Sequence, residues 1–161
     1  GKTEELWTYY CSAQSSKNVS NRFFSMPSVR NRILGYQMYK YSVKGFLHWG
    51  YNFYFSQYSR KPIDPYKVTD AGKAFASGYS FIVYPGDNFT PLNSLRLNVF
   101  YYGLQDMMAL QLLETKIGKE AVVKLMEDST DKPITFSEYP HSNSWLLENR
   151  EKINQKIKKY I

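Results

Sequence analysis

The sequence contains one cysteine, Cys11, and only two histidines, His48 and His141. A single cysteine excludes an internal disulfide and any zinc site built from several thiolates of this chain. The two histidines lie far apart and have no metal-ligand spacing, so we expect no metal and no cofactor. No run of about 18 apolar residues is present to span a membrane, and no signal peptide opens the sequence.

Acidic residues are fewer than basic ones, 14 against 21, which gives a net charge of +7. Such an excess permits an acidic partner but does not require one. The sequence has no glycine-rich phosphate loop, zinc finger or RNA-binding signature, so we expect neither nucleic acid nor a membrane as a partner. The basic residues near the C-terminus are typical of a solvated helix face: Lys152, Lys156, Lys158 and Lys159.

Aromatic residues are abundant at 17%, and most are tyrosine (15) or phenylalanine (10). Tyrosine combines an apolar ring with a polar hydroxyl, which suits carbohydrate clefts and also ordinary half-buried surface. The 161 residues are 43% hydrophobic and 22% charged, as expected for a globular chain with a core. We therefore interpret 1–161 as a single domain.

The densest aromatic stretch, residues 45–55, carries almost no charge. Its side chains alternate between two faces, and this period of two predicts a strand. Both faces are largely apolar, so we expect the strand to be covered on both sides, as parallel strands are in α/β folds. His48 and Asn52 are the polar exceptions. They are either satisfied core residues or part of a ligand site, and for His48 a core role is favoured over that of a general base.

The other elements follow from helix and strand signals along the chain. Together with the aromatic strand they predict three β/α units over 1–118 and additional helices over 119–161. In order, we expect a strand over 6–11, a loop over 12–21, a helix entered at Pro27 and ended by Lys44-Gly45, a long connection over 56–80, a strand over 79–84 stopped by Pro85-Gly86-Asp87, a long helix ended by Gly118, a short helix over 119–128, a loop over 130–143 and a last helix capped by Ser144.

Three parallel strands are too few to close a barrel. They leave sheet edges whose backbone groups must pair with something else. We therefore expect the fold to be α/β, as one part of a larger sheet. The expected partner at the edges is the remainder of a longer polypeptide or a second copy of the chain.

Several ordered blocks between residue 6 and about residue 114 form a recognisable series: Ser20-Asn21-Arg22-Phe23-Phe24, Arg30-Asn31-Arg32-Ile33-Leu34-Gly35-Tyr36-Gln37, Tyr39-Lys40-Tyr41, Gly45-Phe46-Leu47-His48-Trp49-Gly50-Tyr51-Asn52, Phe81-Ile82-Val83-Tyr84-Pro85-Gly86, Ser94-Leu95-Arg96-Leu97 and Gly103-Leu104-Gln105-Asp106. These blocks resemble the family called domain of unknown function 4091, which is similar to glycoside hydrolase family 123, the β-N-acetylgalactosaminidases. Where relatives have Arg-Leu-Glu, this chain has Arg96-Leu97-Asn98, and Ser12 replaces the family's second cysteine.

The resemblance implies that the chain forms the last part of a (β/α)8-like barrel in a longer carbohydrate-active enzyme. In that family an adjacent Asp-Glu pair on an earlier strand performs substrate-assisted hydrolysis of N-acetylhexosaminides. Glu4-Glu5 lies at the wrong end of a strand and Glu127-Asp128 ends a helix, whereas barrel catalysis uses the C-terminal strand ends. We therefore expect no catalytic residues here, and no hydrolysis by these 161 residues alone.

A carbohydrate ligand is the expected partner of the strand ends, because flat aromatic rings stack on pyranoses while amide and hydroxyl groups bond to sugar hydroxyls. For each candidate the alternative is packing in the core. A second hypothesis for the whole chain is a non-catalytic carbohydrate-binding or structural module. The candidate substrate-binding residues are Trp49, Tyr51, Asn52, Tyr84, Trp7 and Tyr9.

Overall fold

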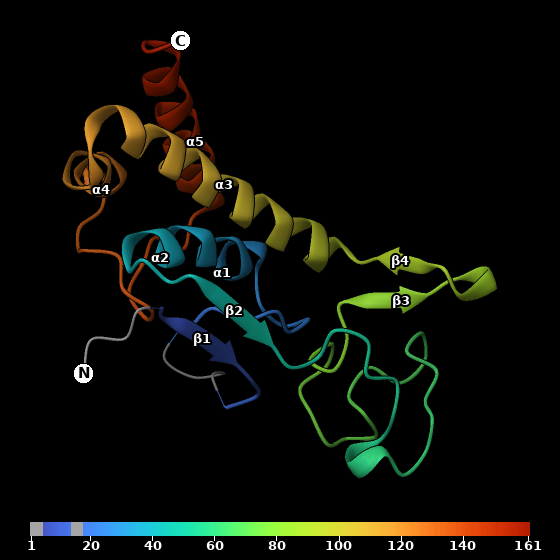
Figure 1. The fold of residues 1–161 in the computed structure, drawn as a ribbon. Helices are drawn as coiled ribbons and strands as arrows, with labels where there is room; N and C mark the ends of the chain where they lie inside the picture. Colours follow the sequence, from blue (N-terminus) through green and yellow to red (C-terminus); the bar gives the residue numbers. More distant parts are fainter. Residues whose placement is uncertain (1–4, 14–17) are drawn as a thin grey trace.

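The computed structural model describes residues 5–13 and 18–161, so Glu4 and residues 14–17 of the predicted loop lie outside the described part. The fold is mixed α/β, with two small sheets and a set of helices (Figure 1). Strands β1 (Trp7–Tyr10) and β2 (Gly45–His48) are parallel and are joined through helices α1 (Ser28–Arg32) and α2 (Leu34–Lys40). This is the crossover that parallel pairing requires.

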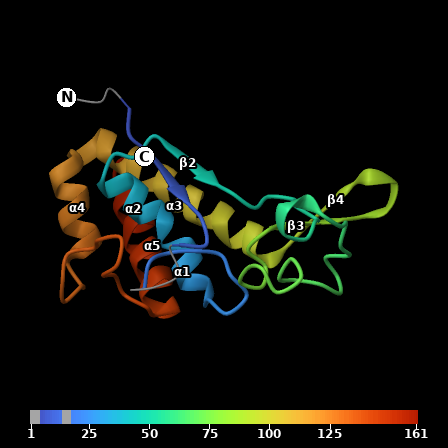
Figure 2. The same ribbon diagram turned by 90° about the horizontal axis from the view of Figure 1, so that it is seen from below.

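The β1/β2 sheet is covered by helices on one face. In its register Tyr10 lies opposite His48 and Thr8 opposite Phe46. Tyr10 packs in a buried cluster with Leu34 and Met38 of α2, and Phe46 lies against the same cluster. The other face carries Trp7, Tyr9 and Leu47, which are 63%, 44% and 55% exposed. Figure 2 views the sheet from this open side, with the helices behind it. The expectation of a strand covered on both faces is therefore wrong for the part of the chain that the structure describes.

The helical layer depends on a close crossing of α2 with α3 (Leu95–Ile117). A Cβ atom added at Gly35 would lie 1.8 Å from the carbonyl oxygen of Gly103, so the two backbones are in contact. Helix α3 begins after Ser94, whose hydroxyl accepts a hydrogen bond from Leu97 N. It ends at Gly118, as predicted. The predicted single helix from Pro27 is divided at Ile33 into α1 and α2.

The aromatic strand is shorter than predicted, because β2 ends at His48. The chain turns at Gly50, where an added Cβ would lie 2.1 Å from the carbonyl oxygen of Tyr79. Residues 51–53 then pair antiparallel with 80–82, through hydrogen bonds from Phe53 N to Ser80 O (2.9 Å) and from Ile82 N to Tyr51 O (2.8 Å). The predicted alternation of faces therefore does not continue past His48.

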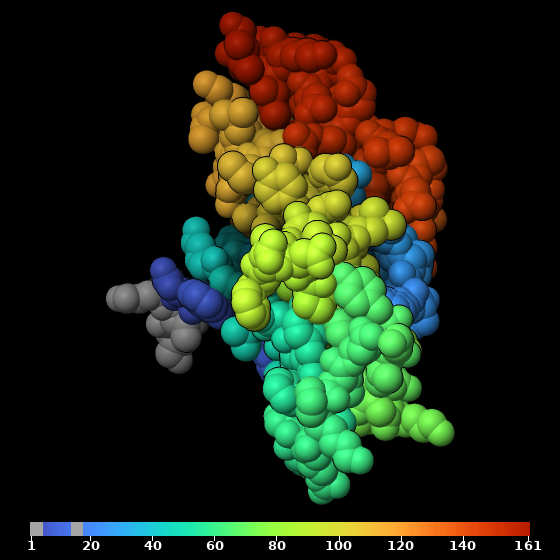
Figure 3. Space-filling model, turned by 90° about the vertical axis from the view of Figure 1, so that its right-hand side faces the viewer, coloured from blue at the N-terminus to red at the C-terminus, as the bar shows by residue number. Residues whose placement is uncertain are grey.

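The third predicted strand does not join the parallel sheet, which corrects the expectation of three parallel β/α units. Instead β3 (Val83–Pro85) pairs antiparallel with β4 (Pro91–Asn93) in a hairpin. The turn contains the short 3₁₀ helix η2 (Asp87–Phe89). The turn residues Pro85-Gly86-Asp87 reverse the direction of the chain. Pro85 and Pro91 lie opposite each other in the hairpin, and neither has an N–H with which to extend the ladder. Figure 3 shows this hairpin between the helices and the long connection.

The C-terminal part adds α4 (Lys119–Glu127) and α5 (Asn143–Lys158) to the core. Helix α5 is capped by Ser142, which accepts from Trp145 N, rather than by the predicted Ser144. Buried side chains from both halves of the chain form one cluster, including Ile33, Leu110 and Ile153. No helix among the described residues is long and apolar enough to cross a bilayer.

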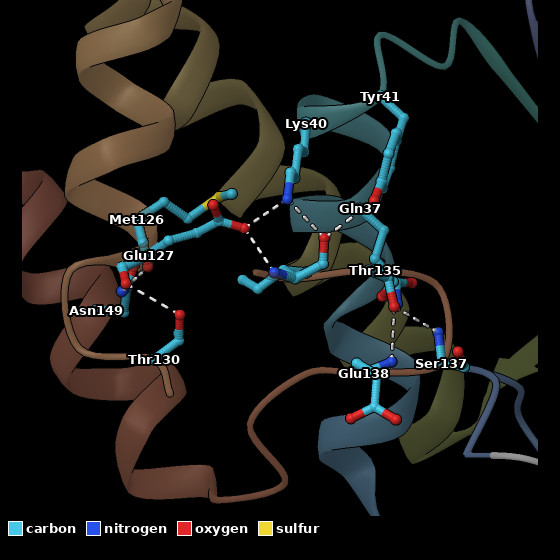
Figure 4. Close-up of polar contacts among 11 residues, drawn as sticks. Gln37, Lys40, Tyr41, Met126, Glu127, Thr130, Thr135, Ser137, Glu138 and Asn149 are labelled. Carbon is cyan, nitrogen blue, oxygen red and sulfur yellow. Dashed lines mark hydrogen bonds and ion pairs between the residues drawn. The ribbon is translucent and has the colours of Figure 1, made fainter. Parts of the chain in front are cut away.

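The loop between α4 and α5 is attached to α2 by partly buried polar contacts (Figure 4). Lys40 Nζ donates to Glu127 Oε1 at 2.7 Å and to the carbonyl of Ile134 at 2.8 Å. Gln37 Nε2 donates to the carbonyl of Thr135 at 2.9 Å. Because these bonds satisfy loop carbonyls with side chains of α2, they fix the loop over the helical layer.

Candidate functional site

Aromatic rings gather where β2 ends. The indole of Trp49 stacks on the ring of Tyr79 with centroids 5.0 Å apart and planes inclined by only 10°. Phe53 and Phe75 contact the same indole at centroid distances of 5.0 and 5.2 Å. We call Trp49, Tyr79, Phe53 and Phe75 the aromatic platform. All four lie beyond the end of β2. The close approach of Gly50 to the carbonyl oxygen of Tyr79 brings Trp49 next to Tyr79.

The aromatic platform forms one side of an open pocket of about 390 Å³. Trp49 is 38% exposed, so part of its indole is available to a ligand. At the rim, Tyr58 and Ser59 in the 3₁₀ helix η1 (Gln57–Ser59) have φ of 60° and 55°, a left-handed conformation that is uncommon for residues other than glycine. The lining residues are Tyr9, Ser12, Trp49, Phe53, Gln57, Tyr58, Ser59, Phe75 and Tyr79.

Hydroxyl and amide groups supply the polar lining of this pocket, through Tyr9, Ser12, Gln57, Tyr58 and Ser59. Burial raises the pKa of Tyr79 to about 12, so its hydroxyl keeps its proton. No carboxylate is found among the described residues of the lining. Nor do the described residues contain a group of histidine, cysteine and acidic side chains that could hold a metal. The lining therefore consists of aromatic rings with hydroxyl and amide groups, and its described residues include no carboxylate.

The structure brings two of the six predicted site residues together, Trp49 and Tyr9. Trp7 lies on the same open face but at the start of β1, where its indole covers Gly45. Tyr51 and Asn52 are exposed and lie in the segment that pairs with 80–82. Neither lines the pocket within the described part of the chain.

The sixth predicted residue, Tyr84, lines a different hollow of about 550 Å³ beside the start of α3, together with Phe24, Asn31, Leu95 and Arg96. Its ring contacts Phe81 at 5.1 Å and Tyr66 at 5.0 Å between centroids. The six predicted residues therefore do not line one common pocket among the described residues. Tyr79, Phe53 and Phe75 were not predicted as site residues. Phe53 lies in the aromatic stretch 45–55, which was a signal for it, whereas no local pattern connects Phe75 or Tyr79 with Trp49.

His48 lies on the helix-covered side of β2, where its ring packs against Phe46 and Tyr79. We expected a core histidine whose hydrogen bonds are satisfied. Both ring nitrogens of His48 are buried, but neither has a hydrogen-bond partner among the described residues. Desolvation, together with the charges of Arg22 and Arg96, lowers the pKa of His48 to about 3. The imidazole is therefore neutral near pH 7. It contacts Tyr79 but is not among the described residues that line the aromatic pocket.

Acidification is expected to destabilise the fold through His48. His48 takes up a proton near pH 6.5 in the unfolded chain and only near pH 3 in the folded chain. The free energy of unfolding is therefore not reduced by protonation of His48 above pH 6.5. As the pH falls from 6.5 toward 3, stability declines by at most about 1.4 kcal/mol per pH unit. Urea unfolding at pH 7.0, 6.0 and 5.0 should show the wild type losing stability relative to His48→Gln. The control His141→Gln should behave as wild type, and parallel curves for His48→Gln and wild type would refute the assignment.

A protein-family model covers the part of the chain that contains this pocket. The model of the glycoside hydrolase 123 catalytic domain matches residues 1–113 of the 161. The chain belongs to this family. No curated protein matches the sequence.

The family 123 match covers β1, β2, the aromatic platform and most of α3, while α4 and α5 follow it. The resemblance to glycoside hydrolase family 123 is therefore confirmed, whereas the name domain of unknown function 4091 stays a prediction. Membership describes a glycoside hydrolase-like module.

Proposed function

We propose that this chain is the C-terminal part of a family 123 barrel that acts on N-acetylhexosamine-containing glycans, and that it supplies substrate-binding residues. The observation that carries the proposal is the stacked Trp49–Tyr79 pair beside an open pocket at the carboxyl ends of the parallel strands β1 and β2. Barrel enzymes bind their substrates at this end of the strands. An exposed indole supported from behind by a second ring offers a rigid surface for the apolar face of a pyranose.

The polar groups of the pocket are suited to hydrogen-bonding the hydroxyl and acetamido groups of a sugar. Ser12, Gln57 and Ser59 can donate to and accept from hydroxyl groups, and Gln57 can also bond an acetamido group. An apolar surface with a few placed polar groups is the usual composition of a small-ligand site. Trp49 is the central contact in this proposal, with Tyr9 beside it. Trp7, Tyr51, Asn52 and Tyr84 are proposed to contact more distant parts of a glycan, from outside the pocket.

The open face of the sheet supports the placement within a longer barrel. Trp7, Tyr9 and Leu47 project from the side opposite the helices, which is the side that lines the interior of a β/α barrel. Within the described residues β1 and β2 pair only with each other, so both outer edges of their sheet are unpaired. We propose that the remainder of a longer polypeptide covers this face and pairs with the edges. A second copy of the chain is the alternative occupant.

Catalysis is proposed to depend on that remainder. The aromatic pocket has no carboxylate among its described lining residues, and the family's chemistry needs an adjacent Asp-Glu pair. The chain alone is therefore expected to bind N-acetylhexosamines without hydrolysing them. Turnover of an aryl N-acetylgalactosaminide by the purified 161 residues would overturn this part of the proposal.

Substitution of Trp49 tests the binding site directly. N-acetylgalactosamine should give saturable quenching of the tryptophan fluorescence of the wild type, and saturation-transfer NMR should detect the bound sugar. Trp49→Ala should weaken binding at least about tenfold, equivalent to ~1.4 kcal/mol, with the circular dichroism spectrum unchanged. The matched control is Trp7→Ala, which removes an exposed indole from the same face outside the pocket. Equal affinity of Trp49→Ala and wild type would refute the site.

The alternative function, a self-standing carbohydrate-binding or structural module, is favoured by the shared helical core that α4 and α5 form with α3. It predicts a stable monomer with no tendency to pair at the open face. Light scattering over a range of concentrations separates the two proposals. Concentration-dependent association that Leu47→Lys suppresses would support the barrel segment, because Leu47 is 55% exposed at the centre of that face.

A further inference from the structure

Arg96 lies in the first turn of α3, and its guanidinium donates hydrogen bonds to three backbone carbonyl oxygens. One terminal nitrogen donates to the carbonyl oxygens of Arg22 (2.8 Å) and Gly78 (2.5 Å), and the other donates to the carbonyl oxygen of Phe81 (2.7 Å). The described ion pairs leave Arg96 without a carboxylate partner. Burial lowers the pKa of the guanidinium. The side chain therefore uses its buried charge to hold backbone carbonyls.

Two of these three carbonyls flank Tyr79 along the chain. Gly78 precedes it, and Phe81 follows it by two residues. Gly78 has φ of 78°, and a Cβ atom there would lie 2.3 Å from the ring of Phe24 and 3.0 Å from the Arg96 guanidinium. The segment 78–81 is therefore enclosed closely at the point where Arg96 holds it, and little freedom is left for the Tyr79 ring that it carries.

Aromatic contacts fix the guanidinium itself. Its central carbon lies 4.6 Å from the ring centroid of Phe24 and 5.7 Å from that of Phe81. Cation–π contacts of this kind strengthen when the cation is shielded from water. Because α3 also packs on α2 through the Gly35–Gly103 crossing, Arg96 connects the rigid helical layer to segment 78–81.

We propose that Arg96 is a positioning residue for the aromatic platform: it fixes segment 78–81 so that Tyr79 supports Trp49 in the orientation that binds a sugar ring. This inference rests on the proposed function. Arg96 contacts neither Trp49 nor the ligand and acts through Tyr79. The planar fork of arginine is needed because a lysine ammonium cannot reach carbonyls in three directions with the same geometry.

The test compares Arg96→Met and Arg96→Lys with Arg32→Met. Arg32 is the matched control, because it also joins α3 to another part of the fold, through Asp106, but has no contact with segment 78–81. The chain is labelled with 5-fluorotryptophan, which gives one ¹⁹F resonance for each of Trp7, Trp49 and Trp145. Trp49→Phe assigns the resonance of interest.

In Arg96→Met the Trp49 resonance should shift and broaden while that of Trp145 in the helical core stays in place. Affinity for N-acetylgalactosamine should fall at least tenfold, and Arg96→Lys should recover only part of it. Arg32→Met should leave the Trp49 resonance and the affinity unchanged even at an equal loss of thermal stability. An unchanged Trp49 resonance in Arg96→Met, or an affinity within twofold of wild type, overturns the inference. A wild type that binds no sugar refutes the proposed function, while the ¹⁹F comparison still decides the role of Arg96.

Discussion

Gly35→Ala is expected to destabilise the fold by about 3 kcal/mol or more, the upper part of the range for overpacking. The added Cβ would lie 1.8 Å from the carbonyl oxygen of Gly103 and 2.5 Å from its carbonyl carbon. Both are backbone atoms of α3, so no change of rotamer relieves the contact and the two helices must separate. Separation would expose part of the core that Ile33, Tyr36 and Leu110 form between them.

The expected destabilisation by Gly35→Ala is opposite in sign to the effect of the same substitution in an exposed helix. In an exposed helix, glycine to alanine stabilises by about 1 kcal/mol, because alanine has the higher helix propensity. At this crossing we expect a fall in melting temperature of about 6–12 °C, using 2–4 °C per kcal/mol for a chain of this size. Gln111→Ala, at an exposed position of α3, should change stability by no more than ~0.5 kcal/mol. A melting temperature equal to or above that of wild type would show that α2 and α3 do not meet at Gly35.

Asp106→Asn is expected to cost about 3–5 kcal/mol, the range for breaking a buried ion pair from one side. The Asp106 side chain is fully buried. It accepts two hydrogen bonds from Arg32, at 2.7 and 3.0 Å, and one from Arg150 at 2.9 Å. An asparagine in its place would direct an amide N–H toward guanidinium donors and leave two partly buried cations without a counter-charge. The contacts of α3 with α1 and α5 would weaken together.

Urea unfolding at pH 7 measures this loss. The matched control is Glu138→Gln, which removes a carboxylate whose ion pair with Lys132 spans 3.8 Å and is more than half exposed on both sides. Exposed pairs of this kind contribute about 0–1 kcal/mol. Equal midpoints for Asp106→Asn and Glu138→Gln would mean that the Arg32–Asp106–Arg150 cluster does not hold the helices together.

Helix boundaries were predicted best, because neighbouring residues encode them. Gly118 ends α3 and Pro27 precedes α1, as their backbone preferences require. The start of β2 at Gly45 was also predicted correctly. The cap of α5 was misplaced by two residues, since Ser142 and Ser144 are equally suitable by type and only the fold selects between them.

Strand pairing was predicted poorly, because it depends on residues far apart in the sequence. The aromatic alternation of 45–55 continues past His48, yet the approach of Gly50 to Tyr79 ends the strand. The approach of Gly50 to Tyr79 also determines which aromatic residues lie at the pocket. It places Trp49 against Tyr79 and leaves Tyr51 and Asn52 on the segment that pairs with 80–82. No local pattern could have grouped Trp49 with Phe75, which lies in the middle of the long connection.

The shared helical core has a consequence for how pieces of this family are delimited. The family match ends at residue 113, within α3 and in the middle of a cluster that also contains Met126, Ile134 and Ile153. An expression boundary drawn there would remove Arg150 from Asp106 and expose one side of Leu110. The segment recognised by sequence likeness is thus smaller than the segment that shares this buried core. Variants of the aromatic pocket should be made in a chain that retains α4 and α5.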